Sequence, residues 1–211
     1  MSGIENHRGI VATLDRANID TDQIIPKQYL KSIKRTGFDE GLFSDWRYLS
    51  DGSLDPEFDL NREQFERATV LVTRNNFGCG SSREHAVWAI VQYGFRVVIA
   101  PWVDRGTGRL PAFADIFANN SVKNGLLTIT LAEPEVQTIF DCVARFPGLE
   151  ATVDLVEQRV VLHMDEKQSF HFDISPVVKE HLIRGLDDIA ITLEHQDAIT
   201  AYEEKCFVDV G

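Results

Sequence analysis

Residues 68–94 read ATVLVTRNNFGCGSSREHAVWAIVQYG, in which a strand, a glycine-rich bend and a helix follow one another. Ala68–Thr73 is a short apolar and β-branched run, which is typical of a strand with both faces buried. Beyond the bend, apolar residues recur at helical spacing up to Gly94, and glycine ends helices easily because it tolerates a left-handed conformation. A second apolar run, Arg96–Ala100, follows directly. The stretch therefore predicts a βαβ unit and, with it, parallel strand pairing.

The rest of the chain extends this α/β pattern. Gly9–Leu14 is an expected first strand, and a short helix near Phe113–Asn119 precedes a strand at Leu126–Leu131. In the last third, an amphipathic helix is expected at Pro134–Phe146. Three strands with alternating apolar residues are expected at Ala151–Val156, Arg159–Met164 and Ser169–Ile174. Two closing helices are expected at Pro176–Arg184 and residues 194–205. We expect a single domain over residues 1–211, with a mainly parallel central sheet followed by a β meander and helices.

Composition narrows the classes of partner. The chain carries 33 acidic and 21 basic residues, a net charge of −12, which argues against nucleic acid or an anionic membrane as a partner. No stretch approaches the roughly 20 apolar residues of a membrane span, and the N-terminus MSGIENHRG lacks the apolar core of a secretory signal. We therefore expect a cytoplasmic protein.

The cysteines indicate neither a disulfide framework nor a metal site. Cys79, Cys142 and Cys206 are widely spaced, with no CxxC pair and no paired histidines near them. We predict no metal ligands in this chain, which by itself does not supply the thiolates of an iron–sulfur cluster.

Two segments before the βαβ unit have unusual compositions. Lys27–Arg35 holds four basic residues and no acidic one, directly after Asn18–Pro26, whose aspartates and proline predict a structured loop rather than a helix. A basic run is usually a solvated face, and only a position beside an anion pocket would give it a binding role. Gly37–Asn61 mixes aromatic residues with turn formers, which predicts an ordered excursion rather than a free linker. Its expected anchors are Phe38, Leu42, Phe43, Trp46 and Tyr48.

The glycine-rich bend has both structural and chemical interpretations. Ser81 with Glu84 fits a capping box, in which the two side chains satisfy backbone donors at a helix start. A serine oxygen among backbone N–H groups at a positive helix end is also a candidate base, because its alkoxide is stabilised there. Arg83 offers a planar fork to a carboxylate, or forms a surface salt bridge. His85 and Cys79 are more simply explained as structural side chains.

The bend matches neither the motif of a phosphate-binding P-loop nor that of a serine nucleophile for acyl transfer. It lacks the GxxxxGK[ST] pattern and the lysine of a P-loop, and no GxSxG nucleophile elbow is present. The pattern points to a small carboxylate.

Several segments resemble one family in order and spacing over nearly the whole chain. They are Asn18–Leu30, Arg35–Leu49, Asn75–Ala89, Tyr93–Pro101, Phe113–Phe117 and Asn124–Leu127. Together they resemble the small subunits of bacterial 3-isopropylmalate dehydratase, and the GCGSSREHA segment is highly specific to the aconitase superfamily. The resemblance implies the swivelling β/β/α domain of that superfamily. It also implies a large partner subunit that carries a four-iron, four-sulfur cluster, with no cofactor in this chain.

The resemblance assigns roles to particular residues. It implies a hydro-lyase subunit that isomerises 2-isopropylmalate to 3-isopropylmalate in leucine biosynthesis, with a small dicarboxylate as substrate. Ser81 resembles the catalytic base, and Ser82 and Arg83 resemble substrate ligands beside it. Asp22 resembles the active-site aspartate, and either Lys34 or Arg35 resembles an arginine that contacts the substrate.

Departures from the family pattern leave the substrate open. Between Pro101 and Phe113 the chain inserts about ten residues, Trp102–Ala112, which we expect to form a surface loop, with a substrate lid or an altered contact between subunits as the alternatives. Val87, Ala118 and Thr128 also replace the usual residues. The same chemistry on citraconate with 2-methylmalate, or on homoaconitate, is therefore an alternative. A stand-alone carboxylate-binding module is a third possibility.

Overall fold

A computed structural model of the chain describes residues 3–31, 35–106, 108–185, 192–193 and 195–208. Four strands form the parallel centre of its sheet: β1 (Asn6–Leu14), β2 (Val70–Thr73), β3 (Val97–Asp104) and β5 (Leu127–Ala132). Their order is β1-β2-β3-β5, and each neighbouring pair is parallel. All four residues of β2 are buried, as the apolar run predicts.

Strand β1 joins this parallel centre to the meander. Its second half pairs with β2, where Val11 lies opposite Val70, whereas its first half pairs antiparallel with β6 (Glu150–Asp154). β7 (Arg159–Leu162) and β8 (Gln168–His171) continue from β6 as antiparallel neighbours. The α/β class, the parallel centre and the C-terminal meander are all confirmed.

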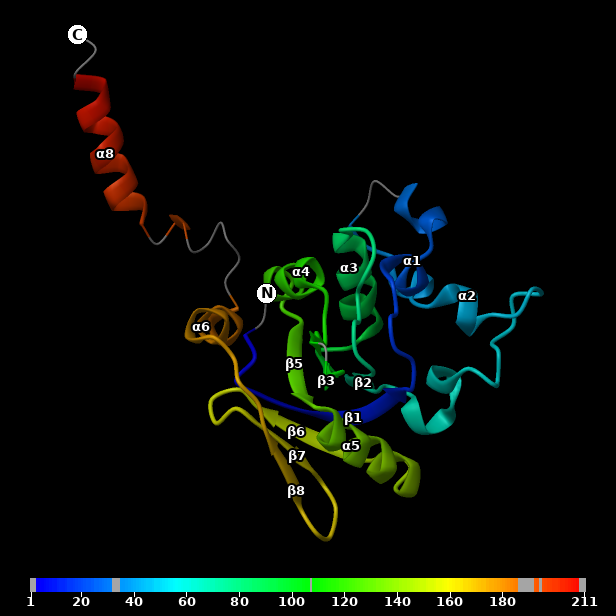
Figure 1. Cartoon of the computed structure of the whole chain (residues 1–211). Coiled ribbons are helices and arrows are strands. Elements are labelled where there is room, and N and C mark those ends of the chain that lie inside the picture. The colour runs from blue at the N-terminus through cyan, green and yellow to red at the C-terminus, as the bar shows by residue number, and fades with distance from the viewer. Residues whose placement is uncertain (1–2, 32–34, 107, 186–191, 194, 209–211) are drawn as a thin grey trace.

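Helices cover both faces of the parallel strands (Figure 1). α3 (Glu84–Tyr93) and α4 (Asp115–Lys123) are the crossovers from β2 to β3 and from β3 towards β5, and they pack against each other. Right-handed crossovers in the same direction along a sheet place both helices on one face. α5 (Glu133–Arg145) contacts β1, β2, β3 and β5 from the other face.

The segment after β1 differs from its prediction. Instead of a loop, a one-turn helix α1 (Thr21–Ile24) forms, followed by a 3-10 turn at Lys27–Lys31. Asp20 and Gln23 form the helix's capping box, in which each side chain accepts a hydrogen bond from the other residue's backbone N–H. This reciprocal cap makes a single turn stable where the sequence pattern suggested a loop.

The aromatic excursion is ordered, as predicted. It contains α2 (Ser44–Arg47) and two short 3-10 turns, at Asp39–Gly41 and Asp59–Asn61, and a further 3-10 turn at Glu63–Phe65 follows it. Of its five predicted anchors, Phe38, Leu42 and Phe43 are at most 1% exposed, whereas Trp46 and Tyr48 are only partly buried.

The inserted segment is a surface hairpin. β3 continues to Asp104, and β4 (Arg109–Leu110) returns antiparallel beside it. The Arg109 guanidinium lies 3.4 Å from the centroid of the Trp102 ring.

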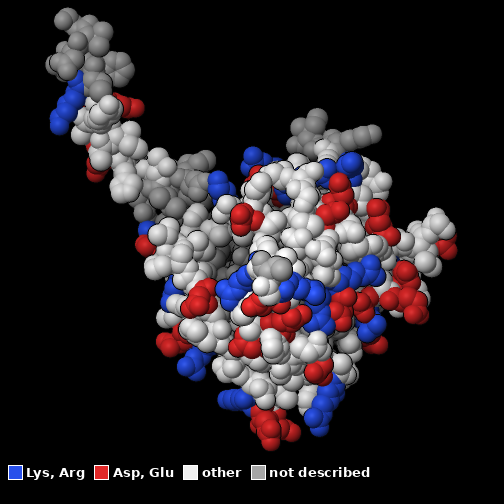
Figure 2. Space-filling view, in the orientation of Figure 1, with Lys and Arg blue, Asp and Glu red and all other residues white. Residues whose placement is uncertain are grey.

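Two helices follow the meander. α6 (Pro176–Arg184) begins at the capping residue Ser175 and ends at Gly185, close to its predicted bounds. α8 (Gln196–Val208) stands apart from the body in Figure 1, and its side chains from Gln196 to Lys205 are exposed. No helix in the described ranges is long and apolar enough to cross a membrane. On the face in Figure 2, acidic and basic side chains are intermixed.

Candidate active site

The glycine-rich bend lies between two other backbone segments. On one side, Asn18 N–H donates to the Asn75 carbonyl and Gly78 N–H donates to the Ile19 carbonyl, at 2.9 and 2.8 Å. On the other side, Phe77 N–H donates to the Ala112 carbonyl at 2.9 Å. The loops that leave the carboxyl ends of the parallel strands β1 and β2 thus run side by side, which is where open α/β sheets bind ligands.

Gly78 makes the close packing of this bend possible. Its φ is +74°, and a Cβ at this position would lie 2.2 Å from the Phe117 ring. Only glycine fits this combination of a left-handed backbone and a covering aromatic ring. The bend is thereby held against the first turn of α4.

A cavity of about 230 Å³ opens where these segments meet. Residues of the glycine-rich bend and Thr21 form one wall, and the first turn of α4 with its N-cap residue forms the other. The lining residues are Thr21, Gly78, Gly80, Ser81, Ser82, Arg83, Ala114, Asp115, Ile116 and Phe117. The structure therefore brings the predicted residues Ser81, Ser82 and Arg83 into one pocket.

Unpaired backbone donors and helix ends favour an anion in this pocket. α3 begins at Glu84 and α4 at Asp115, so the positive ends of both helix dipoles lie at the cavity. Among the described residues, the backbone N–H groups of Gly80, Ser81 and Ser82 find no hydrogen-bond acceptor. Donors of this kind at helix N-termini are suited to carboxylates.

The predicted capping box at Ser81 and Glu84 is wrong. The N-cap residue of α3 is Arg83, and no side chain caps it. The Glu84 carboxylate instead accepts a hydrogen bond of 2.9 Å from Asn124 Nδ2, at the end of α4. Within the described chain, Ser81 Oγ has no hydrogen-bond partner, so this hydroxyl is available to a ligand.

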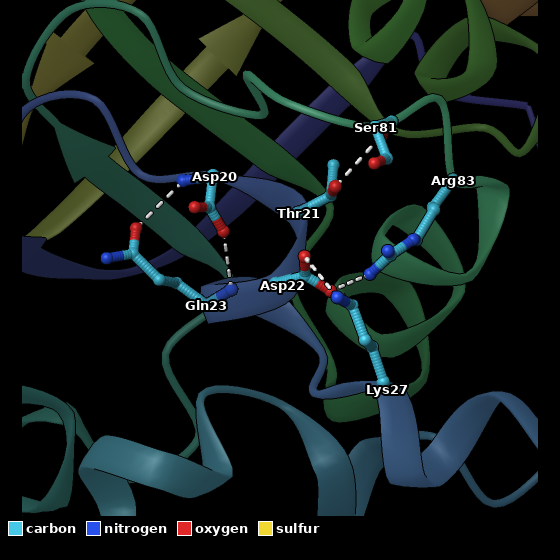
Figure 3. Close-up of polar contacts among 7 residues, drawn as sticks. All are labelled: Asp20, Thr21, Asp22, Gln23, Lys27, Ser81 and Arg83. Carbon is cyan, nitrogen blue, oxygen red and sulfur yellow. Dashed lines mark hydrogen bonds and ion pairs between the residues drawn. The ribbon is translucent and has the colours of Figure 1, made fainter.

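Arg83 is held by a carboxylate from α1. Arg83 Nη1 donates to Asp22 Oδ1, and Lys27 Nζ lies 3.8 Å from Asp22 Oδ2 (Figure 3). The Arg83 side chain is 16% exposed, whereas those of Asp22 and Lys27 are 41% and 75% exposed. The least exposed member of this ion-pair group is thus the one that lines the cavity.

Thr21 holds the backbone of the bend. Its Oγ1 donates to the Ser81 carbonyl at 2.9 Å, and its backbone N–H donates to the Cys79 carbonyl at 2.9 Å. Figure 3 shows Thr21 and Asp22 side by side on α1, one directed to Ser81 and the other to Arg83. Two neighbouring residues of one helical turn therefore contact two predicted site residues.

Known proteins match the chain over nearly its whole length. The aconitase C-terminal domain model matches residues 1–134, and the model for the C-terminal domain of the 3-isopropylmalate dehydratase small subunit matches residues 188–205. The 3-isopropylmalate dehydratase small subunit of Desulforapulum autotrophicum is 55% identical, over 97% of this chain and 96% of that relative. The chain belongs to the family of 3-isopropylmalate dehydratase small subunits. Relatives with the same name from Methylibium petroleiphilum (94% of this chain, 91% of that relative) and Rhodopirellula baltica (97% and 98%) are 53% and 51% identical.

A solved structure supports the same fold for this small-subunit family member. The crystal structure of 3-isopropylmalate dehydratase from Methanocaldococcus jannaschii matches with a TM-score of 0.63, over 94% of this chain and 99% of that one. At 22% identity this match concerns the fold alone. The predicted aconitase-type domain is confirmed.

Of the two predicted cations after α1, only one is described. Lys34 lies outside the described residues. The Arg35 guanidinium lies 5.5 Å from the centroid of the Trp88 ring, and its carbonyl accepts a hydrogen bond of 2.8 Å from Gln92. Arg35 is thus attached to α3 and does not line the cavity.

Cys79 and His85 have structural environments. Burial raises the pKa of the Cys79 thiol, and the nearby Asp20 carboxylate raises it further, so the thiolate is disfavoured. The His85 ring packs edge-on against Phe38 and 4.7 Å from the Trp88 ring centroid. Within the described ranges, no three His, Cys, Asp or Glu side chains gather in a group that suits a metal ion.

Sequence reasoning missed the apolar wall and the threonine. Ile116 is 51% exposed at the cavity, and Phe117 is buried behind it. Both belong to the FADIF segment, which is a signal of family resemblance without a local chemical pattern. Thr21 precedes Asp22 in the sequence, but its contact with Ser81 spans 60 positions and follows only from the fold.

Proposed function

We propose that the chain is the small subunit of a hydro-lyase that isomerises 2-isopropylmalate to 3-isopropylmalate, a step of leucine biosynthesis. The observation that carries this proposal is the Ser81 hydroxyl beside Arg83, which, like the neighbouring backbone donors, has no hydrogen-bond partner among the described residues. The chain is 55% identical to a protein of that name. Family membership supports the reaction, and the pocket supports the division of tasks among the residues.

Ser81 acts as the base of the reaction. Dehydration removes a proton from the carbon next to the one that carries the hydroxyl group, and the hydroxyl leaves with a second proton as water. Rehydration adds the hydroxyl group to the carbon that lost the proton, and a proton to the carbon that lost the hydroxyl group. The Ser81 alkoxide takes and returns the carbon-bound proton, because backbone N–H groups and the α3 dipole stabilise its charge.

Arg83 and Ser82 bind a carboxylate of the substrate. Asp22 occupies Nη1 of the Arg83 guanidinium, and the remaining N–H groups suit a planar carboxylate. Asp22 belongs to the same site through this contact, and Lys34 or Arg35 supplies a further cation to the second carboxylate. The substrate is a small dicarboxylate, and the exposed Ile116 supports an apolar side group on it.

The leaving hydroxyl requires a Lewis acid, which we assign to a four-iron, four-sulfur cluster on the large subunit. The described side chains of this chain do not fit such a cluster, since they contain no suitable group of ligands. The relatives' designation as small subunits supports a large partner subunit. We propose that the assembled enzyme is cytoplasmic and uses neither nucleic acid nor a membrane as a partner.

The test is reconstitution with the large subunit and measurement of isopropylmalate turnover. Ser81→Ala is expected to lower kcat by about 10²- to 10⁴-fold, the usual contribution of a general base. Ser169→Ala, which alters an exposed serine on β8, is the matched control and retains full turnover. Full activity in Ser81→Ala would overturn the assignment of the base.

A competition assay decides the substrate. Isopropylmalate, 2-methylmalate and homoaconitate are compared by kcat/KM in the same reconstituted enzyme. An apolar pocket discriminates by about 1–3 kcal/mol for each missing methylene. A preference for an acid without the isopropyl group would reject the role in leucine biosynthesis.

A further inference from the structure

We infer that the first turn of α1 positions the reacting groups: Thr21 locks the Ser81–Ser82 peptide, and Asp22 orients the Arg83 guanidinium. The inference rests on the proposed roles of Ser81 and Arg83. It assigns positioning roles to residues that contact the site residues rather than the reacting atoms.

The first turn of α1 is suited to this role because it is fixed at both ends. Asp20 and Gln23 cap it reciprocally, through hydrogen bonds of 2.9 and 2.8 Å. At its other end, Ile25 N–H donates to the Thr21 carbonyl at 3.0 Å. Thr21 is 2% exposed, so its hydroxyl has little freedom to choose another partner.

Thr21 prevents a peptide flip in the bend. Gly80 has a φ of +87°, and glycine lets the chain rotate between conformations that other residues avoid. The Ser81 carbonyl and the Ser82 N–H belong to one planar trans peptide, so they point in opposite directions. By holding the carbonyl at 2.9 Å, Thr21 Oγ1 fixes the direction of the unpaired Ser82 N–H and the position of Ser81.

Asp22 acts on the substrate through Arg83. Its carboxylate repels a dicarboxylate substrate, so a direct ion contact between the two is unfavourable. Its contact with Nη1 instead holds one edge of the guanidinium and leaves the other donors for the substrate. Lys27, 3.8 Å away and 75% exposed, partly neutralises the other Asp22 oxygen.

Removal of the Thr21 hydroxyl is expected to slow proton transfer. In the reconstituted enzyme, Thr21→Val lowers kcat by about tenfold to a hundredfold, as misplacement of a reacting group does, and leaves KM within about twofold. The primary isotope effect with substrate deuterated at the reacting carbon rises, because proton abstraction then limits turnover. Thr21→Ser restores kcat to within about threefold.

A matched threonine controls for the general cost of losing a hydroxyl group. Thr138 Oγ1, on α5, also donates to a carbonyl at 2.9 Å, and Thr138→Val is expected to leave kcat unchanged. Equal kcat values in Thr21→Val and Thr138→Val would overturn the role of Thr21, as would failure of Thr21→Ser to restore kcat. Circular dichroism and thermal unfolding of each variant show that it is folded.

Removal of the Asp22 carboxylate is expected to affect binding. Asp22→Ala raises KM about tenfold, roughly the effect of one charge-assisted hydrogen bond, with kcat within about threefold. In an Arg83→Lys background this increase disappears, because a lysine has no fork to orient. A lower KM in Asp22→Ala, or an increase that persists with Lys at position 83, would overturn the role of Asp22.

The outcomes separate this inference from the proposed function. If Ser81→Ala abolishes turnover but the α1 variants show neither effect, only the positioning roles are wrong. If Ser81→Ala is fully active, or isopropylmalate is not converted, the proposed function itself is wrong.

Discussion

The parallel and antiparallel halves of the sheet share strand β1 but differ in chemistry. In the parallel half, the segments that follow β1 and β2 run side by side at one edge of the sheet, where the N-termini of α3 and α4 also lie. In the meander, β6, β7 and β8 are neighbouring antiparallel strands, and no predicted site residue lies on them. The aconitase-domain match covers residues 1–134, which include the parallel strands and precede the meander. The candidate site therefore follows strand direction: the meander extends the core, and the proposed site residues lie in the parallel half.

The largest test of this difference removes one buried aromatic side chain from each half. Phe117 and Phe172 are both 2% exposed, so alanine at either position is expected to cost about 3–5 kcal/mol of unfolding free energy. Only Phe117→Ala should also lower kcat, since Phe117 lines the cavity and covers Gly78. Urea unfolding and turnover per folded molecule measure the two quantities. Equal kcat values in both variants would show that the halves do not differ in this respect.

A second pair of substitutions compares two glycines with the same backbone conformation. Gly78 and Gly148 have φ values of +74° and +76°, but a Cβ at Gly78 meets Phe117 at 2.2 Å, whereas one at Gly148 has no atom within 4 Å. Gly148→Ala therefore costs only the backbone strain, about 1–2 kcal/mol. Gly78→Ala adds an overpacking cost of about 1–3 kcal/mol and displaces α4 from the pocket. Unfolding midpoints in urea that fall equally for both variants would contradict the role of the close contact.

Much of the fold follows from the sequence because its signals are local. The apolar run at β2 and the helical spacing that ends at Gly94 each reflect contacts made within a few residues. Helix caps do not follow from local signals in this way. Asp20 with Gln23 and Ser81 with Glu84 both show the capping-box pattern, yet only the first pair forms a cap.

Tertiary contacts decide between these two signatures. Asn124, 40 positions from Glu84 in the sequence, donates a hydrogen bond to the Glu84 carboxylate. Thr21 donates one to the Ser81 carbonyl. The result is a capped turn where a loop was predicted, and no cap where one was predicted.

The candidate site shows the same division. Ser81, Ser82 and Arg83 are adjacent in the sequence, so one motif identifies them together, and the pocket contains all three. Thr21 and Ile116 reach that pocket from segments on either side of the bend, and only the fold brings them there. Local patterns therefore identify the proposed reacting groups more readily than the residues that would position or enclose them.

A smaller effect concerns the junction between the halves. His7, on the antiparallel part of β1, lies 2.7 Å from the hydroxyl of Thr69, which precedes β2. Burial lowers the pKa of His7, and the charge of Arg96 lowers it further. The unfolded chain therefore binds more protons than the folded one, and stability falls as pH decreases below about 6.5 towards the lowered pKa, by at most about 1.4 kcal/mol per pH unit. His7→Gln should reduce this slope in urea unfolding between pH 7 and pH 5, and an unchanged slope would contradict the assignment.

The smallest expected effect concerns the inserted hairpin on the parallel half. The Arg109 guanidinium stacks on Trp102 at 3.4 Å, and such a contact at an exposed site contributes about 0.5–1 kcal/mol. Arg109→Ala should lower the unfolding free energy by about that amount, while Arg109→Lys retains part of it because a lysine cation also binds the ring face. The hairpin's return strand leads to Pro111 and Ala112, whose carbonyls accept hydrogen bonds from the glycine-rich bend, but those bonds involve only the backbone. Turnover in the reconstituted enzyme should therefore stay within about twofold. A larger loss of kcat with unchanged stability would show that the hairpin contacts the substrate or the large subunit, and that the parallel half extends its site beyond the pocket.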